Sequence, residues 1–549
     1  MNRIPLSQKD FVDGSYIITE PGYYYLTEDI VFNPNHNDNL HPFDSGFPYP
    51  HQTIYNHPRF QLGFFAAIII QTNNVIFDLN NFTLSQHPIH ALKQRFFALL
   101  ELASKPFIPN QGPHNFGSPL EPAHHLVIKN GTLGLNSHHG IHGNENHDVL
   151  IENVIFKDFE VAAISLNHAS NITINQCQIL HNRHDIPVKG IFSNAVFIRP
   201  YIKELLLTDP NAQLLPHLDI KTIDYQLDDL LKKTYDYVIH HQTKYYPYYN
   251  LIINQTGLID GPSYGILIHS QGVAINGFAK KDEFRSKDII ITNNLIKGIH
   301  NHTIEIPAIK YNNKPCTDAI GAVMNFFNGS IIDNQYVGNP ILNAQIIIHK
   351  YKNILKRNTS RSNLPNDFDL FLTNQKTFDY PVFLGGDVMF HVNKGNFGIR
   401  VDSTNTLLIE NNLFDNLKNF TPMGLNIKGD PHPGNNLPDY GGCMNRGISI
   451  AYCKNTTILN NQISNLHSSY SCNFGINIFL DSVYTTIYDN KITNLTNNKN
   501  LDINNYIDNP TAKPLCCGIE INKSNYINIL KNNQINHLHG FTNININIL

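Results

Sequence analysis

A short motif recurs along the whole chain and constrains its fold more than any other feature. The motif is isoleucine or leucine, any residue, asparagine, two further residues and a large apolar residue. The copies are Leu79/Asn81/Leu84, Ile128/Asn130/Leu133, Ile151/Asn153/Phe156, Ile291/Asn293/Ile296, Ile332/Asn334/Val337, Ile409/Asn411/Phe414, Ile458/Asn460/Ile463 and Leu530/Asn532/Ile535. Gln176 and Asp489 take the asparagine place in two more copies. Copies in a fixed context indicate a repeat protein.

The context is a second apolar segment that begins with Gly-Ile and precedes the motif by 13 or 14 residues. The pairs are Gly140/Asn153, Gly398/Asn411, Gly447/Asn460, Gly475/Asp489 and Gly518/Asn532. A near-constant offset places two strands on one rung with a short turn between them. Positions 130, 153 and 176 are 23 residues apart, which defines the minimal coil, and larger gaps are coils plus insertions. The pattern predicts an all-β, single-stranded right-handed parallel β-helix with short helical insertions.

The residue types suit such a coil. Alternating isoleucine, leucine and valine point into a stacked core. Asparagine tolerates left-handed backbone conformations at turns and can form amide ladders between rungs, and each glycine would allow a tight bend before its strand. The alternative folds, a propeller or a sandwich, need hairpins, and few Asn-Gly or Asp-Gly pairs separate apolar runs here.

The domain organisation follows from where the repeat is interrupted. Residues 1–66 are expected to form N-terminal capping strands and a loop, and residues 67–549 the β-helix. Insertions are expected near 199–249, 338–388, 417–445 and 497–515. Apolar residues at helical spacing in 220–231 and 346–355 predict short helices inside the first two insertions. Insertions on one side of a rigid solenoid are common places for binding sites.

Composition excludes several classes of protein. The net charge is −4, which argues against a general nucleic-acid-binding surface. The first residues lack the apolar core of a signal peptide, and no stretch approaches the roughly 20 apolar residues that span a membrane. The seven cysteines form no compact disulfide framework, so we interpret them as mostly reduced. We expect no cofactor.

Three segments carry a resemblance to a known group of proteins. Residues 17–32 (IITEPGYYYLTEDIVF), 67–85 and 126–135 resemble the opening of pectin-lyase-like right-handed β-helix proteins. They are similar in style to members from amoeba-infecting giant DNA viruses, and the absence of tryptophan favours the viral members. The resemblance implies the β-helix fold. It implies no single activity, because the group contains lyases, hydrolases, epimerases and non-catalytic adhesins or virion fibre proteins.

Candidate catalytic residues were sought on the Gly-Ile strands, where the second and fourth residues after glycine should point outward. Those positions hold His142, Arg400, Asp402 and Glu520 among others, on the face where the resemblance implies acidic groups. Arg400 and Glu520 are three identified rungs apart, about 14 Å at the usual strand spacing. Asp402 has no carboxylate partner on the next rung. The hydrolase signatures of the resembling group are missing, so any enzymatic site would have to be completed by insertions.

Two clusters outside these strands are candidate binding sites. His138, His139, His142 and His147 could bind a metal, but their loop lacks the spacing of a known site, and satisfied or solvated surface histidines are the favoured interpretation. A run of tyrosines is a candidate platform for stacking glycans. It comprises Tyr245, Tyr246, Tyr248 and Tyr249. The same run could instead simply cover the coil.

Three functions remain open from the sequence, the third being a glycan-binding module built on the tyrosine run. We favour a non-catalytic structural or fibre protein of a virus particle, made in the host cytoplasm, self-assembling and in contact with glycans. The strand-like residues 542–549 have no polar cap, so another subunit could dock there, or an insertion could fold over them. Other virion proteins are the alternative partners. The second function is a polysaccharide lyase or glycoside hydrolase.

Overall fold

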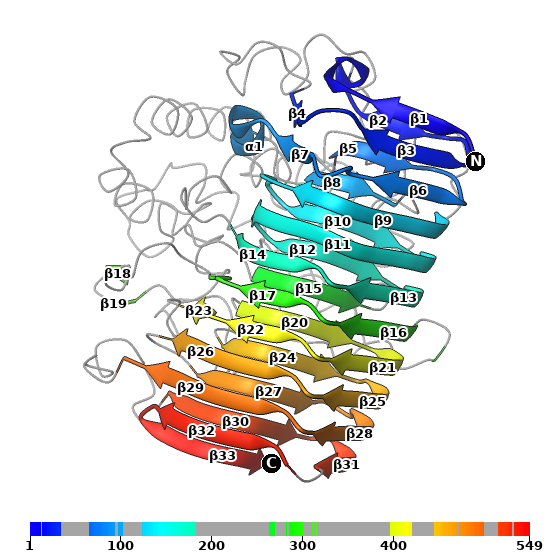
Figure 1. The fold of residues 1–549 in the computed structure, drawn as a ribbon. Helices are drawn as coiled ribbons and strands as arrows, with labels where there is room; N and C mark the ends of the chain where they lie inside the picture. The colour runs from blue at the N-terminus through cyan, green and yellow to red at the C-terminus, as the bar shows by residue number, and fades with distance from the viewer. Residues whose placement is uncertain are drawn as a thin grey trace, which may run out of the picture.

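The structure of the chain is a computed structural model that describes residues 1–12, 14–33, 65–93, 97–102, 123–182, 263–269, 282, 285–300, 310–311, 314–315, 396–419, 444–468, 472–498, 514–529 and 532–549. Strands make up most of this part, and nearly all of them pair in parallel. Figure 1 shows them stacked in one column from the N-terminal strands, in blue, to the C-terminal strands, in red. The described chain is therefore a right-handed parallel β-helix, which confirms the predicted fold.

Sheet B, the 11-stranded sheet, contributes one strand to each rung in strict sequence order. Its strands are β2 (Tyr16–Ile18), β5 (Phe65–Ile70), β8 (Phe97–Glu101), β10 (His139–Asn144), β12 (Ala162–Asn167), β15 (Ser263–His269), β20 (Asn396–Asp402), β24 (Asn445–Ala451), β27 (Asn473–Phe479), β30 (Leu515–Asn522) and β33 (Thr542–Ile548). Long stretches of sequence separate β15 from β12 and β20, yet β15 pairs in register with both. The predicted Gly-Ile strands are the strands of this sheet.

Sheet A, the 20-stranded sheet, contains two parallel series that follow each sheet B strand. The first series is β1 (Arg3–Leu6), β3 (Gly22–Leu26), β6 (Val75–Asp78), β9 (His124–Leu133), β11 (His147–Phe159), β13 (Ser170–Asn175), β16 (Ser286–Thr292), β21 (Thr404–Glu410), β25 (Lys454–Leu459), β28 (Val483–Tyr488) and β31 (Asn525–Ile529). The second series shares β9 and β11 and adds β4 (Ile30–Phe32), β7 (Thr83–Gln86), β14 (Gln178–Asn182), β17 (Leu295–Lys297), β22 (Leu413–Asp415), β26 (Gln462–Ser468), β29 (Lys491–Asn497) and β32 (Gln534–His539).

The motif asparagines occupy the turn between the two series of sheet A. Every motif position in the described residues has a left-handed backbone, with φ from 52° at Asn153 to 77° at Asn532. Asparagine is one of the residues that adopt this conformation at low cost, so its recurrence fixes the same bend on each rung. The predicted role of the motif asparagine at turns is confirmed.

The main asparagine ladder is formed by the residue that directly follows the motif asparagine. Asn294, Asn412, Asn461, Asn490 and Asn533 stack inside the coil, and each amide donates to the next side-chain oxygen at 3.0 Å. These amides also donate to backbone carbonyls of neighbouring strands, for example Asn461 to Ile409 at 2.9 Å. Burial of an amide is tolerated because every rung satisfies the next. The exposed motif asparagines add shorter ladders of their own, such as Asn460 to Asn411 at 2.5 Å.

The recurring glycines serve close packing rather than a bend. Gly447 lies inside β24, where an added Cβ would come within 2.7 Å of the Gly475 carbonyl oxygen and 2.9 Å of the Ile463 side chain. Its φ is not in the left-handed region. The prediction of a tight bend at these glycines is therefore wrong. Only the smallest residue fits where sheet B passes over the apolar core.

The first strands are rungs of the same coil. β1 pairs with β3 and β3 pairs with β6, all in parallel register, and the 3-10 helix η1 (Gln8–Phe11) buries Phe11 beside them. The one α-helix among the described residues is α1 (Pro88–Lys93). The insertions predicted near 199–249 and 338–388, with their helices, lie outside the described residues. The insertions predicted near 417–445 and 497–515 are described only at their ends. These ends include strand β23 (Lys418–Asn419) and the last residue of β29. The two-residue strands β18 (Lys310–Tyr311) and β19 (Lys314–Pro315) pair antiparallel.

No helix within the described ranges is long and apolar enough to cross a membrane. The five described cysteines are free thiols, and all are buried: Cys177, Cys453, Cys472, Cys516 and Cys517. Burial raises the pKa of the Cys177, Cys453 and Cys472 thiols to about 12. Because the thiolate is the reactive form, these three cysteines are not candidate nucleophiles.

Candidate functional site

The outer face of sheet B gathers most of the candidate catalytic residues. The positions two residues after the glycine are in cross-strand register along the sheet. They are Ile69, Glu101, His142, Ser165, Leu267, Arg400, Ser449, Asn477, Glu520 and Asn547. The polar members from Glu101 to Glu520 point away from the apolar core, as predicted. They are nevertheless buried, so this face is not an open surface in the protein.

Arg400 and Asp402 form an ion pair at the centre of this face. The Arg400 Nε donates to Asp402 Oδ2 at 2.9 Å, and its Nη2 lies 2.7 Å from Oδ1. His269, from β15, places Nδ1 3.1 Å from the same Oδ2. Only 7% of Arg400 and 1% of Asp402 are exposed. A two-point guanidinium–carboxylate contact in a dry environment is strong and fixes both groups in place.

The polar contacts continue from Arg400 across three further strands. Arg400 Nη1 donates to Ser449 Oγ at 2.8 Å, and Ser449 donates to Asn477 Oδ1 at 3.2 Å. Asn477 Nδ2 donates to Glu520 Oε2 at 2.6 Å. We call this series, from His269 through Asp402, Arg400, Ser449 and Asn477 to Glu520, the polar relay. It joins five successive strands of sheet B: β15, β20, β24, β27 and β30.

The pKa values of the two carboxyl groups of the polar relay are shifted in opposite directions. Burial alone would raise the pKa of Asp402, but the charge of Arg400 and the His269 imidazole lower it below its ordinary value. Burial raises the pKa of Glu520, and Arg446 and the amides of Asn547 and Asn477 only partly oppose it. Glycoside hydrolysis also uses two carboxyl groups whose pKa values are shifted apart. In that chemistry the two carboxyl groups lie about 5–9.5 Å apart. Here Asp402 and Glu520 are on the first and last of four successive strands, β20, β24, β27 and β30.

Aromatic rings flank the arginines of this face. The Arg400 guanidinium lies 4.5 Å from the ring centroid of Phe479 and 5.6 Å from that of Phe397. Arg446, one strand below Phe397, lies 5.0 Å from the same ring. Cation–π contacts of this kind stabilise a charge that has lost its water. The guanidinium groups are thus held by carboxylate, hydroxyl and ring partners.

His142 belongs to a separate buried pair. Its Nδ1 lies 2.8 Å and 2.9 Å from the two carboxylate oxygens of Glu101 on the preceding strand. The ring of His139 stacks on His142 at 5.2 Å between centroids, and His138 lies 4.0 Å from His139. These three histidines are buried rather than on the surface, and His142 is satisfied by Glu101. His147 is apart from them, at the start of β11.

An exposed row of left-handed residues contrasts with the covered face. The second or third residue of each first-series strand of sheet A, from β9 onward, has φ between 50° and 60°. We call these residues, with Asn74 before β6, the corner row: Asn74, His125, Asp148, Asn171, Asp288, Thr406, Asn455, Tyr484 and Tyr526. All except the half-buried Asp148 are exposed. Threonine and tyrosine rarely adopt this conformation, which makes Thr406, Tyr484 and Tyr526 notable positions.

Tyr484 and Tyr526 form the largest exposed aromatic surface of the corner row. Their ring centroids are 5.3 Å apart and the rings are inclined by only 18°. The two residues are 58% and 70% exposed. An exposed pair of stacked rings on adjacent rungs is an apolar surface that also carries hydroxyl groups.

The candidate residues are thus distributed over three places. Arg400, Asp402 and Glu520 share the polar relay, His142 pairs with Glu101, and His147 lies beside the corner row. The tyrosines expected to stack glycans, Tyr245, Tyr246, Tyr248 and Tyr249, lie outside the described residues. The sequence analysis missed His269, although Gly265-Ile266 and the fourth-residue rule would have found it. It also missed Glu101, whose strand carries no glycine signal.

The strand pairing places the chain in the class of right-handed parallel β-helix proteins. No protein-family model matches the chain, and no curated protein matches it. Among solved structures it is similar to the A-module of a mannuronan C-5 epimerase of Azotobacter vinelandii, at 8% identity and a TM-score of 0.35, covering 100% of this chain and 88% of that one.

Two further solved structures are similar. One is the tailspike protein of E. coli bacteriophage HK620 in complex with pentasaccharide, at 7% identity and a TM-score of 0.26, covering 93% of this chain and 60% of that one. The other is a family 28 exopolygalacturonase of Yersinia enterocolitica, at 7% identity and a TM-score of 0.24, covering 99% and 72%. At these TM-scores the fold assignment rests on the strand pairing itself. The resemblance to giant-virus members stays a prediction.

Proposed function

We propose that this chain is a structural β-helix protein of a virus particle that contacts glycans through its exposed corner row. The observation that carries the proposal is the stacked, exposed pair Tyr484 and Tyr526. Sugar rings present flat C–H faces that pack against aromatic rings, while hydroxyl groups at the ring edge bond to polar neighbours. The rigid coil holds both stacked rings in place before any ligand arrives, which lowers the ordering cost of binding.

The state of the polar relay supports a non-catalytic role. Its charged groups contact one another at hydrogen-bonding distance and are buried, so they act as a fixed network rather than as groups facing a substrate. The asparagine ladder adds further cross-rung support inside the coil. Both features favour a rigid scaffold.

Self-assembly is part of the proposal. Strand β33 pairs with β30, and its Ile546 and Ile548 side chains are 41% and 69% exposed. Exposed apolar side chains on a strand favour pairing with another chain. Light scattering at micromolar concentration should show a homo-oligomer, and purified particles of the source should contain many copies. A monodisperse monomer that is absent from particles would contradict the structural role.

The glycan contact is tested by calorimetry with a panel of neutral and acidic oligosaccharides. We expect the wild-type protein to bind at least one of them, and Tyr484→Ala together with Tyr526→Ala to weaken that binding at least tenfold. Tyr488→Ala is the matched control, because this half-buried tyrosine lies on the same strand outside the stack. Equal binding by the double variant, or no binding by the wild type, would contradict the proposal.

The second candidate is a polysaccharide lyase or glycoside hydrolase. The observation in its favour is the opposite pKa shift of Asp402 and Glu520. Incubation with acidic and neutral polysaccharides would reveal unsaturated products or new reducing ends. Turnover that disappears in a folded Arg400→Lys or Glu520→Gln variant would replace the structural proposal with the enzymatic one.

A further inference from the structure

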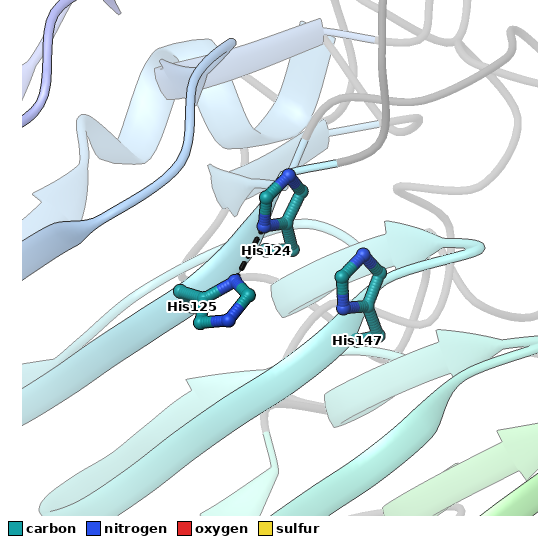
Figure 2. A group of neighbouring side chains, drawn as sticks. All are labelled: His124, His125 and His147. Atoms are coloured by element: carbon teal, nitrogen blue, oxygen red, sulfur yellow. Dashed lines mark hydrogen bonds between the residues drawn. The ribbon is translucent and has the colours of Figure 1, made fainter.

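Three histidines come together where two neighbouring strands of sheet A begin. His124 and His125 open β9, and His147 opens β11 on the next rung. The parallel register places His147 directly beside His124, and their rings stack with centroids 4.4 Å apart and planes 10° apart. Figure 2 shows the three rings gathered at these strand starts. The pairing agrees with the sequence repeat, because β9 and β11 begin 23 residues apart, the length of the minimal coil.

The ring nitrogens of the three histidines converge. One nitrogen from each ring lies within 4.8 Å of those of the other two. The Nδ1 atoms of His124 and His125 are 2.5 Å apart. Two imidazole nitrogens at that distance need a proton or a cation between them, since their lone pairs otherwise repel. Within the described residues this is the group of side chains whose geometry could hold a metal ion.

A carboxylate behind the rings sets their orientation. Asp148 Oδ2 lies 2.8 Å from His147 Nδ1 and 3.4 Å from His125 Nε2. Asn171, on the next rung, donates a hydrogen bond to Asp148 Oδ1. Asp148 thus has polar partners on both sides, Asn171 and His147. An acceptor on Nδ1 of His147 and on Nε2 of His125 leaves their opposite nitrogens, Nε2 and Nδ1, as the metal-binding atoms.

The remaining ring has a polar neighbour on the opposite side. The His124 Nε2 lies 3.2 Å from the Asn73 amide group. The atom of Asn73 that faces this ring is Nδ2, while the Asn73 Oδ1 accepts a hydrogen bond from Asn74 Nδ2 at 2.7 Å. Each of the three rings therefore has an outer partner on one nitrogen, and the carboxylate partner of His125 and His147 is of the kind found around imidazole ligands of metals.

We propose that His124, His125 and His147 bind a divalent transition-metal ion of the zinc type, with Asp148 as a positioning residue. Neutral imidazole suits zinc, copper, nickel and iron, and does not suit magnesium or calcium, which prefer oxygen ligands. Three protein ligands leave one position of a tetrahedral ion open for water or another ligand. His125 and His147 have side chains that are 53% and 41% exposed, so an ion can enter from solvent.

The bound ion would join two adjacent rungs of the coil. His125 and Asp148 are members of the corner row, so the metal would lie on the same exposed line as Tyr484 and Tyr526, far along the coil (Figure 1). The proposal does not depend on glycan contact. It is an independent property of the two strands that begin at His124 and His147.

The test uses full-length protein freed of metal with a chelator and titrated with Zn²⁺ by calorimetry and with Co²⁺ by visible absorption. We expect one ion per chain with a tetrahedral Co²⁺ spectrum. His125→Ala and His147→Ala should each weaken binding at least tenfold, and Asp148→Asn about 10- to 100-fold. His537→Ala is the control, because it removes an exposed histidine of β32 outside the cluster and should change nothing.

Two further readouts separate metal ligation from a structural effect of the substitutions. The thermal unfolding of each metal-free variant should match that of the wild type, while Zn²⁺ should raise the midpoint only in the wild type and His537→Ala. Binding should weaken as the pH falls, because protons compete with the metal ion for the imidazole nitrogens. Equal affinity in the wild type and His147→Ala, or affinity unchanged between pH 7.5 and 5, would overturn the proposal.

Discussion

The polar relay and the corner row are made in the same way and end in opposite states. Both arise because parallel strands in register place equivalent side chains above one another, about 4.8 Å apart. In the relay the stacked groups are buried and contact each other, as Arg400 contacts Asp402 and Ser449. In the corner row they remain exposed, as Tyr484 and Tyr526 do. The difference shows that stacking alone produces a binding surface only where it stays open to solvent.

The largest loss of stability should come from removing a charge in the polar relay. Asp402→Ala leaves the Arg400 guanidinium buried without its partner carboxylate, which should destabilise the protein by about 3–5 kcal/mol. Urea unfolding followed by circular dichroism measures the change. Lys297→Ala is the control, because its ion pair with Asp415 at 3.1 Å is half exposed and should cost about 0–1 kcal/mol. Similar losses of unfolding free energy in both variants would mean that the polar relay is accessible to solvent.

A smaller effect is expected in the asparagine ladder, which is buried but uncharged. Asn461→Ala removes an amide that bonds to Ile409 and Asn490 and accepts from Asn412. Leaving those groups unsatisfied should cost about 1–3 kcal/mol. Thr457, on strand β25 just before Asn461, has a half-buried side chain, and Thr457→Ala should cost under about 0.5 kcal/mol. A loss as large as that of Asp402→Ala would show that burial, rather than charge, dominates the covered positions.

The smallest effect concerns pH. The folded pKa of Glu520 is raised above the unfolded value near 4.3, so its contribution to stability is present below that pH and is lost as pH rises through the folded pKa. Glu520→Gln keeps the uncharged form and should therefore be more stable than the wild type at neutral pH, but not near pH 4. Thermal unfolding from pH 4 to 8 measures the difference.

The contribution of Asp402 to stability depends on pH in the opposite direction. Its folded pKa is lowered, so its contribution is present above the unfolded value near 3.9 and is lost as pH falls through the folded pKa. A Glu520→Gln curve parallel to that of the wild type at every pH would show that the Glu520 carboxyl is solvated. The comparison between the covered relay and the open corner row would then no longer hold at β30.

The fold was predictable because its causes are local. Positive φ at Asn153 or Asn460 and close packing at Gly447 impose fixed residue types at fixed spacing, and spacing is visible in a sequence. Outward directions were predictable for the same reason, as at Arg400 and Glu520. Burial was not predictable, since it depends on what covers the outer face of sheet B. The histidine cluster was also missed, because His124 and His147 become neighbours only through rung register.

Strand β15 has a consequence for how such a chain folds and diversifies. It pairs in register with β12 and β20 although long stretches separate them in sequence. Closing a loop costs only about 0.6 kcal/mol more for each doubling of its length. The coil can therefore accept long grafted segments at this rung with little loss of equilibrium stability. The effect falls on kinetics, because distant pairings form slowly. We expect the contiguous rungs β9–β14 to nucleate first and β15 to pair later. The rung of β15 is therefore a position that tolerates insertions during evolution.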